Sequence, residues 1–398
     1  MSPNPTTPAP QRLLFLDWLR IGAFALLVLY HVGMYYVSWP WHVKSPAAGA
    51  WLEPWMRLSS PWRLSLLFLI SGAATSFMLQ RGGASVALLA SRSKRLLWPL
   101  LFGMAVIVPP QSYFEVIHSH GYAGSYLDFL RLYFSGYGGF CARAGQCLIL
   151  PTWNHLWFVA YLLVYTLLLW LVVRLSPTVL DALASLQARA LRGAALLWLP
   201  IAALALARLA LIDRFAPTHA LVDDWYLHAT HFALFAIGAA WARDPAAWQR
   251  CAEQRWPALA IAAAAWCALA LLPQLAATPG PWRTLARIAF AAMQWSAVVA
   301  AVGFARVHLN RDHSWRATLA EAVFPVYIVH QTLIIVFAMA LAGLRWPPIV
   351  EGPALVGLTF ATSFAAYLVA RRVPWLRPAL GLGAAVVAPR TALRAAAR

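Results

Sequence analysis

Charged residues are scarce in this sequence of 398 residues: Asp, Glu, Lys and Arg together make up 11%, while hydrophobic residues make up 62%. An ordinary soluble domain carries roughly a quarter charged residues, so the composition excludes that class of protein. Several apolar runs exceed the roughly 18 residues that cross a hydrocarbon core about 30 Å thick. The sequence therefore predicts an integral membrane protein.

Acidic residues are especially few: 13 Asp and Glu stand against 31 Lys and Arg, which gives a formal net charge of +18. A strongly basic protein can bind nucleic acid, but these basic residues are scattered through short segments and form no contiguous basic domain. We therefore expect no nucleic acid partner and interpret the excess positive charge as a signal of membrane topology.

Cysteine is also rare, with four residues in the chain. Cys251 and Cys267 are isolated, whereas Cys141 and Cys147 share a segment that we predict to lie outside the cytoplasm. A disulfide between that pair stays open, because an oxidising compartment permits it but the spacing alone does not decide it. No paired ligand motif accompanies the cysteines, so no metal site is expected.

Ten apolar runs are present, and each is long enough to predict a membrane-spanning helix. They cover residues 13–36, 64–80, 96–113, 156–173, 194–211, 226–241, 256–272, 285–307, 323–344 and 354–369. Trp is abundant, at 21 copies, and much of it lies near the ends of these runs, as expected of rings at the headgroup boundary. The predicted fold is an all-α polytopic membrane protein of about ten transmembrane helices.

Basic residues between the runs are unevenly distributed, and the positive-inside rule places the richer side, with both termini, in the cytoplasm. Residues 1–11 are rich in Pro, Ser and Thr and are predicted to form a disordered cytoplasmic tail. Residues 12–375 are predicted to form the membrane domain, and residues 376–398 a basic cytoplasmic tail.

The first predicted helix carries three ionisable residues, Asp17, Arg20 and His31. Eleven residues advance an α-helix by about three turns, so Arg20 and His31 share one face and lie roughly 16 Å apart along its axis. Ionisable groups in a membrane helix normally face the bundle interior or a water-filled path. We expect a site along this face, with His31 near the outer side. An interfacial pair of Asp17 and Arg20, with His31 bonded to a neighbouring helix, is the alternative.

A short basic cluster, Arg92 to Arg95, precedes the third run. The guanidinium fork suits phosphate groups, although such a cluster at a helix end is by itself a common topology signal. Ser71 and Gly72 in the second run are small and allow close helix approach.

Two further histidines are associated with the predicted runs. His155 lies at the start of the fourth run, close to Trp157, and His330 lies within the ninth. Histidine inside a membrane helix is uncommon and is a candidate functional residue.

The order of these motifs resembles the integral-membrane acyltransferase-3 family, whose members have an Arg or Lys, ten residues and a His in the first helix, followed by Arg-x-x-Arg. The matching positions here are Arg20 with His31 and Arg92 with Arg95. The resemblance covers residues 12–375 and is closest to the branch that adds succinyl groups to osmoregulated periplasmic glucans. The segments that carry this closer resemblance are 41–43, 70–72, 155–158 and 327–330.

The resemblance implies an O-acyltransferase of the bacterial inner membrane. Its donor would be cytoplasmic acyl-CoA, with succinyl-CoA favoured and acetyl-CoA the other candidate, and its acceptor a hydroxyl of a periplasmic glucan or other glycan. Membrane lipid and a glycan synthase are the further expected partners. We assign catalysis to His31, Asp17 and Arg20, donor binding to Arg92, Arg95, Ser71 and His330, and acceptor binding to His155, Trp157 and Glu115.

His31 is the expected general base, because an imidazole with a pKa near neutrality can remove the proton of a sugar hydroxyl as it attacks a thioester. A covalent acyl-histidine intermediate stays open as the other route. Residues 114–154, which contain Glu115, are expected to be the longest outer loop and to contact the acceptor.

Two other classes of protein compete with an enzyme. A transporter or flippase of a polar solute or acyl donor also places ionisable residues inside the membrane, but the sequence shows no inverted hydropathy repeat. A membrane scaffold would use the same residues only to organise the bundle.

Overall fold

The computed structural model describes residues 13–143, 146–272 and 280–383. Within these ranges the chain is helical apart from loops and a small antiparallel hairpin of β1 (Cys141–Arg143) and β2 (Gln146–Cys147). The predicted tail at residues 1–11, and residues 384–398 of the predicted C-terminal tail, lie outside the described residues. The all-α fold class is confirmed.

Six helical segments of the described chain are long and apolar enough to cross a membrane. They are α1 (Leu14–Tyr36), α3 (Arg63–Gly82), α7 (Trp157–Leu175) with the preceding turn Asn154–Leu156, α14 (Pro281–His308), α15 (Arg316–Leu341) with the following turn Ala342–Leu344, and α16 (Pro348–Arg372). In such helices every backbone hydrogen bond is made within the segment, which lipid requires.

Two bent helix pairs in the described residues bring the number of apolar candidate spans to as many as eight, if each pair is counted as one span. One joins α4 (Val86–Phe102) and the π-turn Gly103–Ile107 to α5 (Pro109–His120) at 41°; the other joins α8 (Val179–Ala190) to α9 (Ala195–Leu211) at 110°. The remaining predicted runs form shorter helices, namely α13 (Arg255–Leu271) and α10 (Trp225–Leu227) with the π-turn His228–Phe232 and α11 (Ala233–Trp241). Ten crossings, and termini in the cytoplasm, stay predictions.

Short helices lie between these elements. They are the turn Ala50–Leu52, α2 (Glu53–Arg57), α6 (Tyr126–Phe134), α12 (Pro245–Glu253) and α17 (Leu376–Ala379). The last of these packs against α4, so the chain that follows residue 375 is partly built into the bundle.

Residues 114–154, expected as an outer loop, are largely structured. Pro109 and Pro110 start α5, because proline suits a first helical turn and cannot continue the hydrogen bonds of the preceding one. The helix then runs on to His120, beyond the predicted run. Ser125 caps α6 by accepting a hydrogen bond from the backbone N–H of Asp128. A disulfide joins Cys141 to Cys147 across the hairpin, which answers the question that the spacing left open.

Helices α3 and α11 approach closely through two glycines. A Cβ on Gly72 would lie 1.9 Å from the carbonyl oxygen of Phe235, and one on Gly238 would lie 1.9 Å from that of Leu69. Small residues permit this backbone contact, which contributes packing where the hydrophobic effect between helices is absent. The close approach predicted at Gly72 is confirmed.

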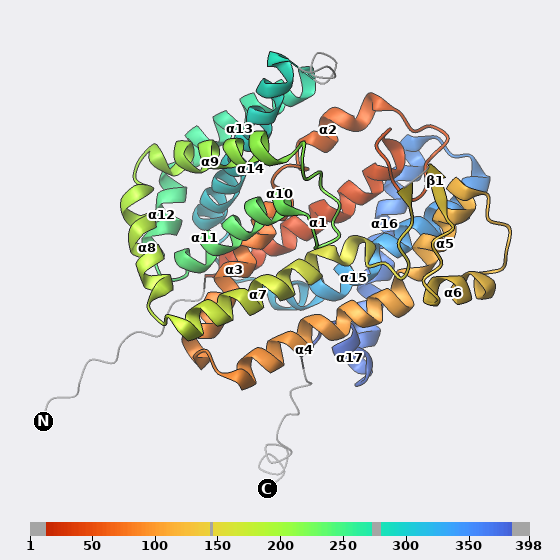
Figure 1. Ribbon diagram of the computed structural model, residues 1–398, viewed down its shortest axis with the longest axis horizontal. Coiled ribbons are helices and arrows are strands. Elements are labelled where there is room, and N and C mark those ends of the chain that lie inside the picture. The colour runs from red at the N-terminus through yellow and green to blue at the C-terminus, as the bar shows by residue number, and fades with distance from the viewer. Residues whose placement is uncertain (1–12, 144–145, 273–279, 384–398) are drawn as a thin grey trace, which may run out of the picture.

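The position of α1 is central: it contacts α3, α14, α15 and α16, and Figure 1 shows it passing through the middle of the bundle. Side chains placed along α1 can be contacted from several helices, which is the setting expected for buried polar residues.

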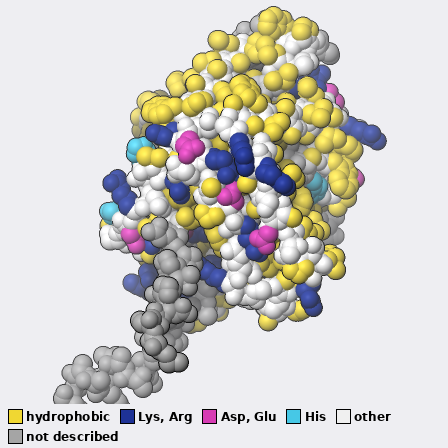
Figure 2. All heavy atoms as spheres, turned by 90° about the vertical axis from the view of Figure 1, so that its left-hand side faces the viewer, with side chains coloured by type: hydrophobic (Ala, Val, Ile, Leu, Met, Phe, Trp, Pro, Cys, Tyr) yellow, Lys and Arg dark blue, Asp and Glu magenta, His cyan; other side chains and the backbone are white. Residues whose placement is uncertain are grey.

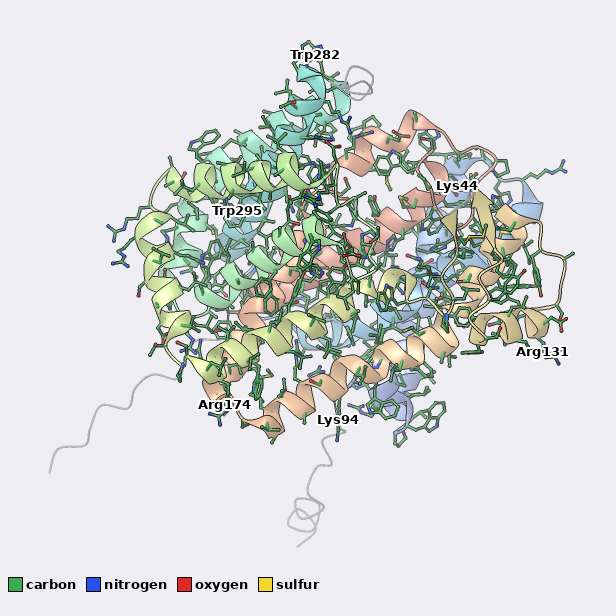
Figure 3. The ribbon with its side chains drawn as sticks, in the orientation of Figure 1. Lys44, Lys94, Arg131, Arg174, Trp282 and Trp295 are labelled. Carbon is green, nitrogen blue, oxygen red and sulfur yellow. A yellow bond between two sulfur atoms is a disulfide. The ribbon has the colours of Figure 1, made fainter. Side chains whose placement is uncertain are left out.

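Charged side chains gather on the end of the molecule that contains α8. Figure 2 shows Lys, Arg and acidic side chains gathered on this end, bordered by hydrophobic surface. The residues there include ion pairs such as Arg243 with Asp181 at 3.2 Å and Arg250 with Asp244 at 2.7 Å. Figure 3 shows Arg174 at this side of the bundle, far from Lys44 and Arg131.

Candidate active site

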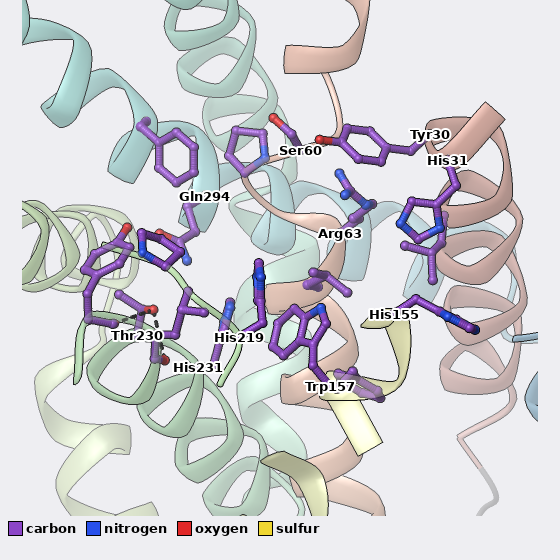
Figure 4. A pocket seen from close by; sticks show the side chains of 18 of the residues that line it. Tyr30, His31, Ser60, Arg63, His155, Trp157, His219, Thr230, His231 and Gln294 are labelled. Carbon is purple, nitrogen blue, oxygen red and sulfur yellow. Dashed lines mark hydrogen bonds between the residues drawn. The ribbon is translucent and has the colours of Figure 1, made fainter. Parts of the chain in front are cut away.

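A cavity of about 500 Å³ lies where α1, α3, α7, α9 and α14 meet, near the end of α1 that leads to residue 36. Three of the predicted site residues line it, namely His31, His155 and Trp157. Figure 4 shows His31 and His155 on one side of the cavity, with Trp157 between them and the two histidines of the other side, His219 and His231. Aromatic side chains provide much of the remaining wall, including Trp41 and Tyr226.

His31 is hydrogen-bonded to a second histidine. Its Nδ1 lies 2.7 Å from Nε2 of His330, and the two rings stack at a centroid distance of 5.0 Å. The other ring nitrogen of His330, Nδ1, lies 2.6 Å from the carbonyl oxygen of Tyr327. A carbonyl only accepts, so Nδ1 of His330 carries a proton and its Nε2 accepts one from Nδ1 of His31. This arrangement leaves Nε2 of neutral His31 with a free lone pair.

His155 is held at both ring nitrogens. Its Nε2 donates to the carbonyl oxygen of Ile328 at 3.0 Å, and Nε2 of Gln111 lies 3.3 Å from its Nδ1. The hydroxyl of Tyr327 donates to the carbonyl oxygen of His155 at 2.6 Å. Both nitrogens of His155 are therefore engaged, whereas no described residue forms a hydrogen bond with Nε2 of His31. The imidazoles of His31 and His155 both line the cavity, but only that of His31 has a ring nitrogen available to act as a base.

Glu115 lies behind the cavity wall and does not line it. Its carboxylate is 2.5 Å from Nδ1 of His42, whose Nε2 is 3.0 Å from Nε2 of Gln331. Gln331 also donates to the side-chain oxygen of Gln111, which is the partner of His155. Glu115 is thus connected to His155 through a chain of polar side chains.

Asp17 and Arg20 lie at the other end of α1 and do not reach the cavity. Asp17 pairs with Arg316 at 2.5 Å, and Nη2 of Arg20 donates to the carbonyl oxygen of Ala320 at 2.8 Å. Both partners belong to the start of α15, so these residues join α1 to the same helix that carries His330.

Arg92 lies within electrostatic range of Arg95 and Arg20, so the two predicted motifs form one positive cluster. Nε of Arg92 is buried without a hydrogen-bond partner, while Nε of Arg95 donates to the carbonyl oxygen of Gly381 at 3.3 Å. None of the three lines the cavity, nor do Ser71 and His330. The structure therefore separates two groups of predicted residues along α1.

Several cavity residues were not predicted from the sequence. The most buried cation among them is Arg63, which directly precedes the predicted run 64–80 and is the first residue of α3, only 5% exposed. Its position directly before an apolar run was the only available signal. The others include Tyr30, Arg208, His219, His231 and Gln294, of which Arg208, His231 and Gln294 are polar residues within predicted runs. Across the described ranges, no three His, Cys, Asp or Glu side chains gather as a metal ion would need.

The comparison with protein families bears directly on this site. A family model described as an acyltransferase domain matches residues 13–368. This range includes the ionisable residues of α1 and both histidines of the hydrogen-bonded pair. The chain belongs to the acyltransferase-3 family. It is accordingly a membrane protein of an acyl-transferring family, as the apolar helices and the motifs predicted.

Curated relatives of this family member match over part of their length. Glucans biosynthesis protein C of Escherichia coli strain SMS-3-5 is 29% identical over 170 residues, covering 42% of this chain and 41% of the relative. The protein of the same name from strain K12 is 28% identical over the same share of each chain. The matched region thus spans about two-fifths of these relatives. No solved structure matches the chain.

Proposed function

We propose that this protein transfers an acyl group from cytoplasmic acyl-CoA to a hydroxyl of a glycan on the outer side of the bacterial inner membrane, with His31 as the general base. The observation that carries the proposal is the 2.7 Å contact between Nδ1 of His31 and Nε2 of His330. His31 also lines the cavity. This contact selects the tautomer in which Nε2 of His31 can accept a proton.

The reaction follows from this geometry. Nε2 of His31 takes the proton of the sugar hydroxyl while the sugar oxygen attacks the thioester carbonyl carbon. A new C–O bond forms, the C–S bond breaks, and the leaving thiolate takes the proton from the imidazolium. During the protonated stage Nδ1–H of His31 continues to donate to His330. General base catalysis of this kind contributes about 10²- to 10⁴-fold. The same lone pair could form an acyl-histidine, which is the alternative route.

The donor would bind with its phosphates at the cluster of Arg20, Arg92 and Arg95 and its thioester at His31. The guanidinium fork matches phosphate oxygens, and the cluster is at the end of α1 that is predicted to be cytoplasmic. About 16 Å of helix axis separates Arg20 from His31, so the arm of the donor would follow α1. The cavity does not extend to Arg20, Arg92 or Arg95. The proposal therefore requires a path along α1, between this cluster and the cavity, to open when the donor binds.

The acceptor would approach the cavity from the opposite end. Trp41, Trp157 and Tyr226 offer flat apolar faces among polar groups, a combination that suits a sugar ring. The relatives are named for the biosynthesis of glucans, which supports a glucan as the acceptor. Succinyl is favoured as the acyl group by the resemblance described above, with acetyl as the second candidate.

The test compares extracytoplasmic glycans from cells with and without the protein by mass spectrometry, because the mass difference identifies both acyl group and acceptor. Cells that make His31→Ala should lack the modification while the variant accumulates in the membrane at the normal level. Identical glycan masses with and without the wild-type protein would refute the function. Full modification by His31→Ala would refute His31 as the base.

A further inference from the structure

Arg63 is a buried cation in the wall of the cavity that contains His31. It is 5% exposed, and Figure 4 shows its side chain directed into the pocket beside His31 and Tyr30. The guanidinium also interacts electrostatically with His31. A positive group therefore lies beside the ring that is proposed to perform the chemistry.

The charge of Arg63 has no anionic partner among the residues that the structure describes. Its Nε and Nη1 are buried without a hydrogen-bond partner, and in the described chain no carboxylate lies within 4.0 Å of the guanidinium. Its guanidinium carbon lies 3.3 Å from the centroid of the Tyr30 ring. The uncharged Tyr30 side chain, through its ring and its hydrogen bond to the guanidinium, offsets only part of the cost of removing an ion from water, so the site is incomplete without an anion.

The helix that carries Arg63 adds to the same preference. Arg63 is the first residue of α3, a helix of 20 residues, and Ser60, Pro61 and Leu64 around that first turn also line the cavity. A helix N-terminus attracts anions and disfavours cations, so an arginine placed there is stabilised by a bound anion and not by the helix. A second cation, Arg208, lines the same cavity, and its Nε is likewise buried without a hydrogen-bond partner.

We propose that Arg63 and the first turn of α3 bind the free carboxylate of a dicarboxylic acyl chain and thereby select the acyl donor. A guanidinium fork and a carboxylate match in shape and charge. The acyl chain is the part of the substrates that must lie beside His31 during transfer, whereas the donor phosphates are assigned to the arginines at the far end of α1. The proposal rests on the proposed function and names the residue that determines its acyl specificity.

The experiment measures acyl transfer by purified, lipid-reconstituted protein with succinyl-CoA and with acetyl-CoA as donors. Arg63→Met should lose roughly 100-fold in kcat/KM for succinyl-CoA and no more than a few-fold for acetyl-CoA. Arg81→Met, which removes an exposed arginine at the other end of α3, is the matched control and should leave both values unchanged.

Each other outcome overturns the assignment. Equal losses with both donors would mean that Arg63 acts on the reacting carbonyl or on an anion of the acceptor, and unchanged values would remove it from the site. If the wild-type protein uses neither donor, the proposed function itself fails, which is a distinguishable result.

A binding measurement keeps the test independent of activity. Succinate at millimolar concentration should raise the melting temperature of the wild-type protein in detergent and should leave that of Arg63→Met unchanged, while acetate should affect neither. Arg63→Met should fold, because it removes a buried charge that lacks a partner. The same response to succinate in both proteins would contradict the proposal.

Discussion

Nδ1 of His31 and Nε2 of His330 lie 2.7 Å apart although 299 residues separate them in the chain. The pair joins α1 to α15, and the carbonyl oxygen of Tyr327 fixes the tautomer of the second ring. His330 is fully buried and does not line the cavity, so its position favours a role in orienting His31 over the donor-binding role expected from the sequence.

Replacing His330 by Phe should lower kcat by roughly 100-fold, because His31 loses the acceptor that fixes its tautomer. KM for acyl-CoA should change little. Steady-state kinetics of the reconstituted protein separate the two parameters, and His308→Phe, at an exposed histidine at the end of α14, serves as the control. A raised KM with an intact kcat would instead assign His330 to donor binding.

Replacing both Arg92 and Arg95 by Ala should weaken acyl-CoA binding by about 10- to 100-fold, since charge-assisted hydrogen bonds to phosphate are lost. Titration calorimetry on the detergent-solubilised protein measures the affinity directly. The matched control is Lys94→Ala, an exposed cation on the same helix whose loss should have little effect. Affinity that is equal in wild-type and doubly substituted protein would remove these arginines from the donor site.

Gly72→Ala should destabilise the protein by about 1 to 3 kcal/mol, because the added Cβ would meet the backbone of Phe235 and push α3 away from α11. Gly357→Ala is the control, since a Cβ at that position meets no atom within 4 Å. Denaturant titration in mixed micelles compares the free energies of unfolding of the two variants. Equal stabilities would show that the two helices do not require this close contact.

Lys44, in the loop after α1, should make the free energy of unfolding depend on pH in the alkaline range. Burial lowers the pKa of Lys44 from 10.5 to about 8, partly opposed by the carboxylate of Glu53. The folded protein therefore binds fewer protons than the unfolded chain between these values, and stability should rise as pH increases from about 8 to 10.5. The contribution is fully present above 10.5 and is lost as pH falls through 8.

Thermal unfolding at pH 8 and pH 10 measures this effect, and Lys44→Met should show a smaller gain over the same interval. The Nζ of Lys44 donates to the carbonyl oxygens of Met34 and Val37, so the variant also loses a cap at the end of α1. The comparison is therefore of the pH slopes and not of the absolute melting temperatures. Parallel slopes would show that Lys44 keeps its ordinary pKa.

The sequence was most informative where a property depends on local composition. All ten apolar runs are helical, since a chain in lipid must satisfy its backbone hydrogen bonds within each segment. The spacing of Arg20 and His31 placed them on one face of one helix, which follows from helix geometry alone. It could not show that α5 would extend to His120 or that α8 would turn sharply into α9.

The site itself depended on contacts between distant helices. Arg63 has an unremarkable local sequence, and only the packing of α3 against its neighbours makes it a buried cation. The contact between His330 and His31 could not be predicted for a similar reason, because no local pattern states which ring nitrogen of His31 another histidine meets. Such contacts depend on how the surfaces of two helices fit together, which the sequence of either helix alone does not state.

The amino-acid sequence alone determined the membrane environment, the helical class and the motifs of an acyltransferase, because these follow from hydrophobicity and spacing along one segment. The tertiary structure alone decided that His31 would be hydrogen-bonded to His330, and that the buried Arg63 would lie beside it. The physical reason is that a hydrogen bond or an uncompensated charge inside the bundle is defined by which helices pack together, and that choice is made by the whole chain.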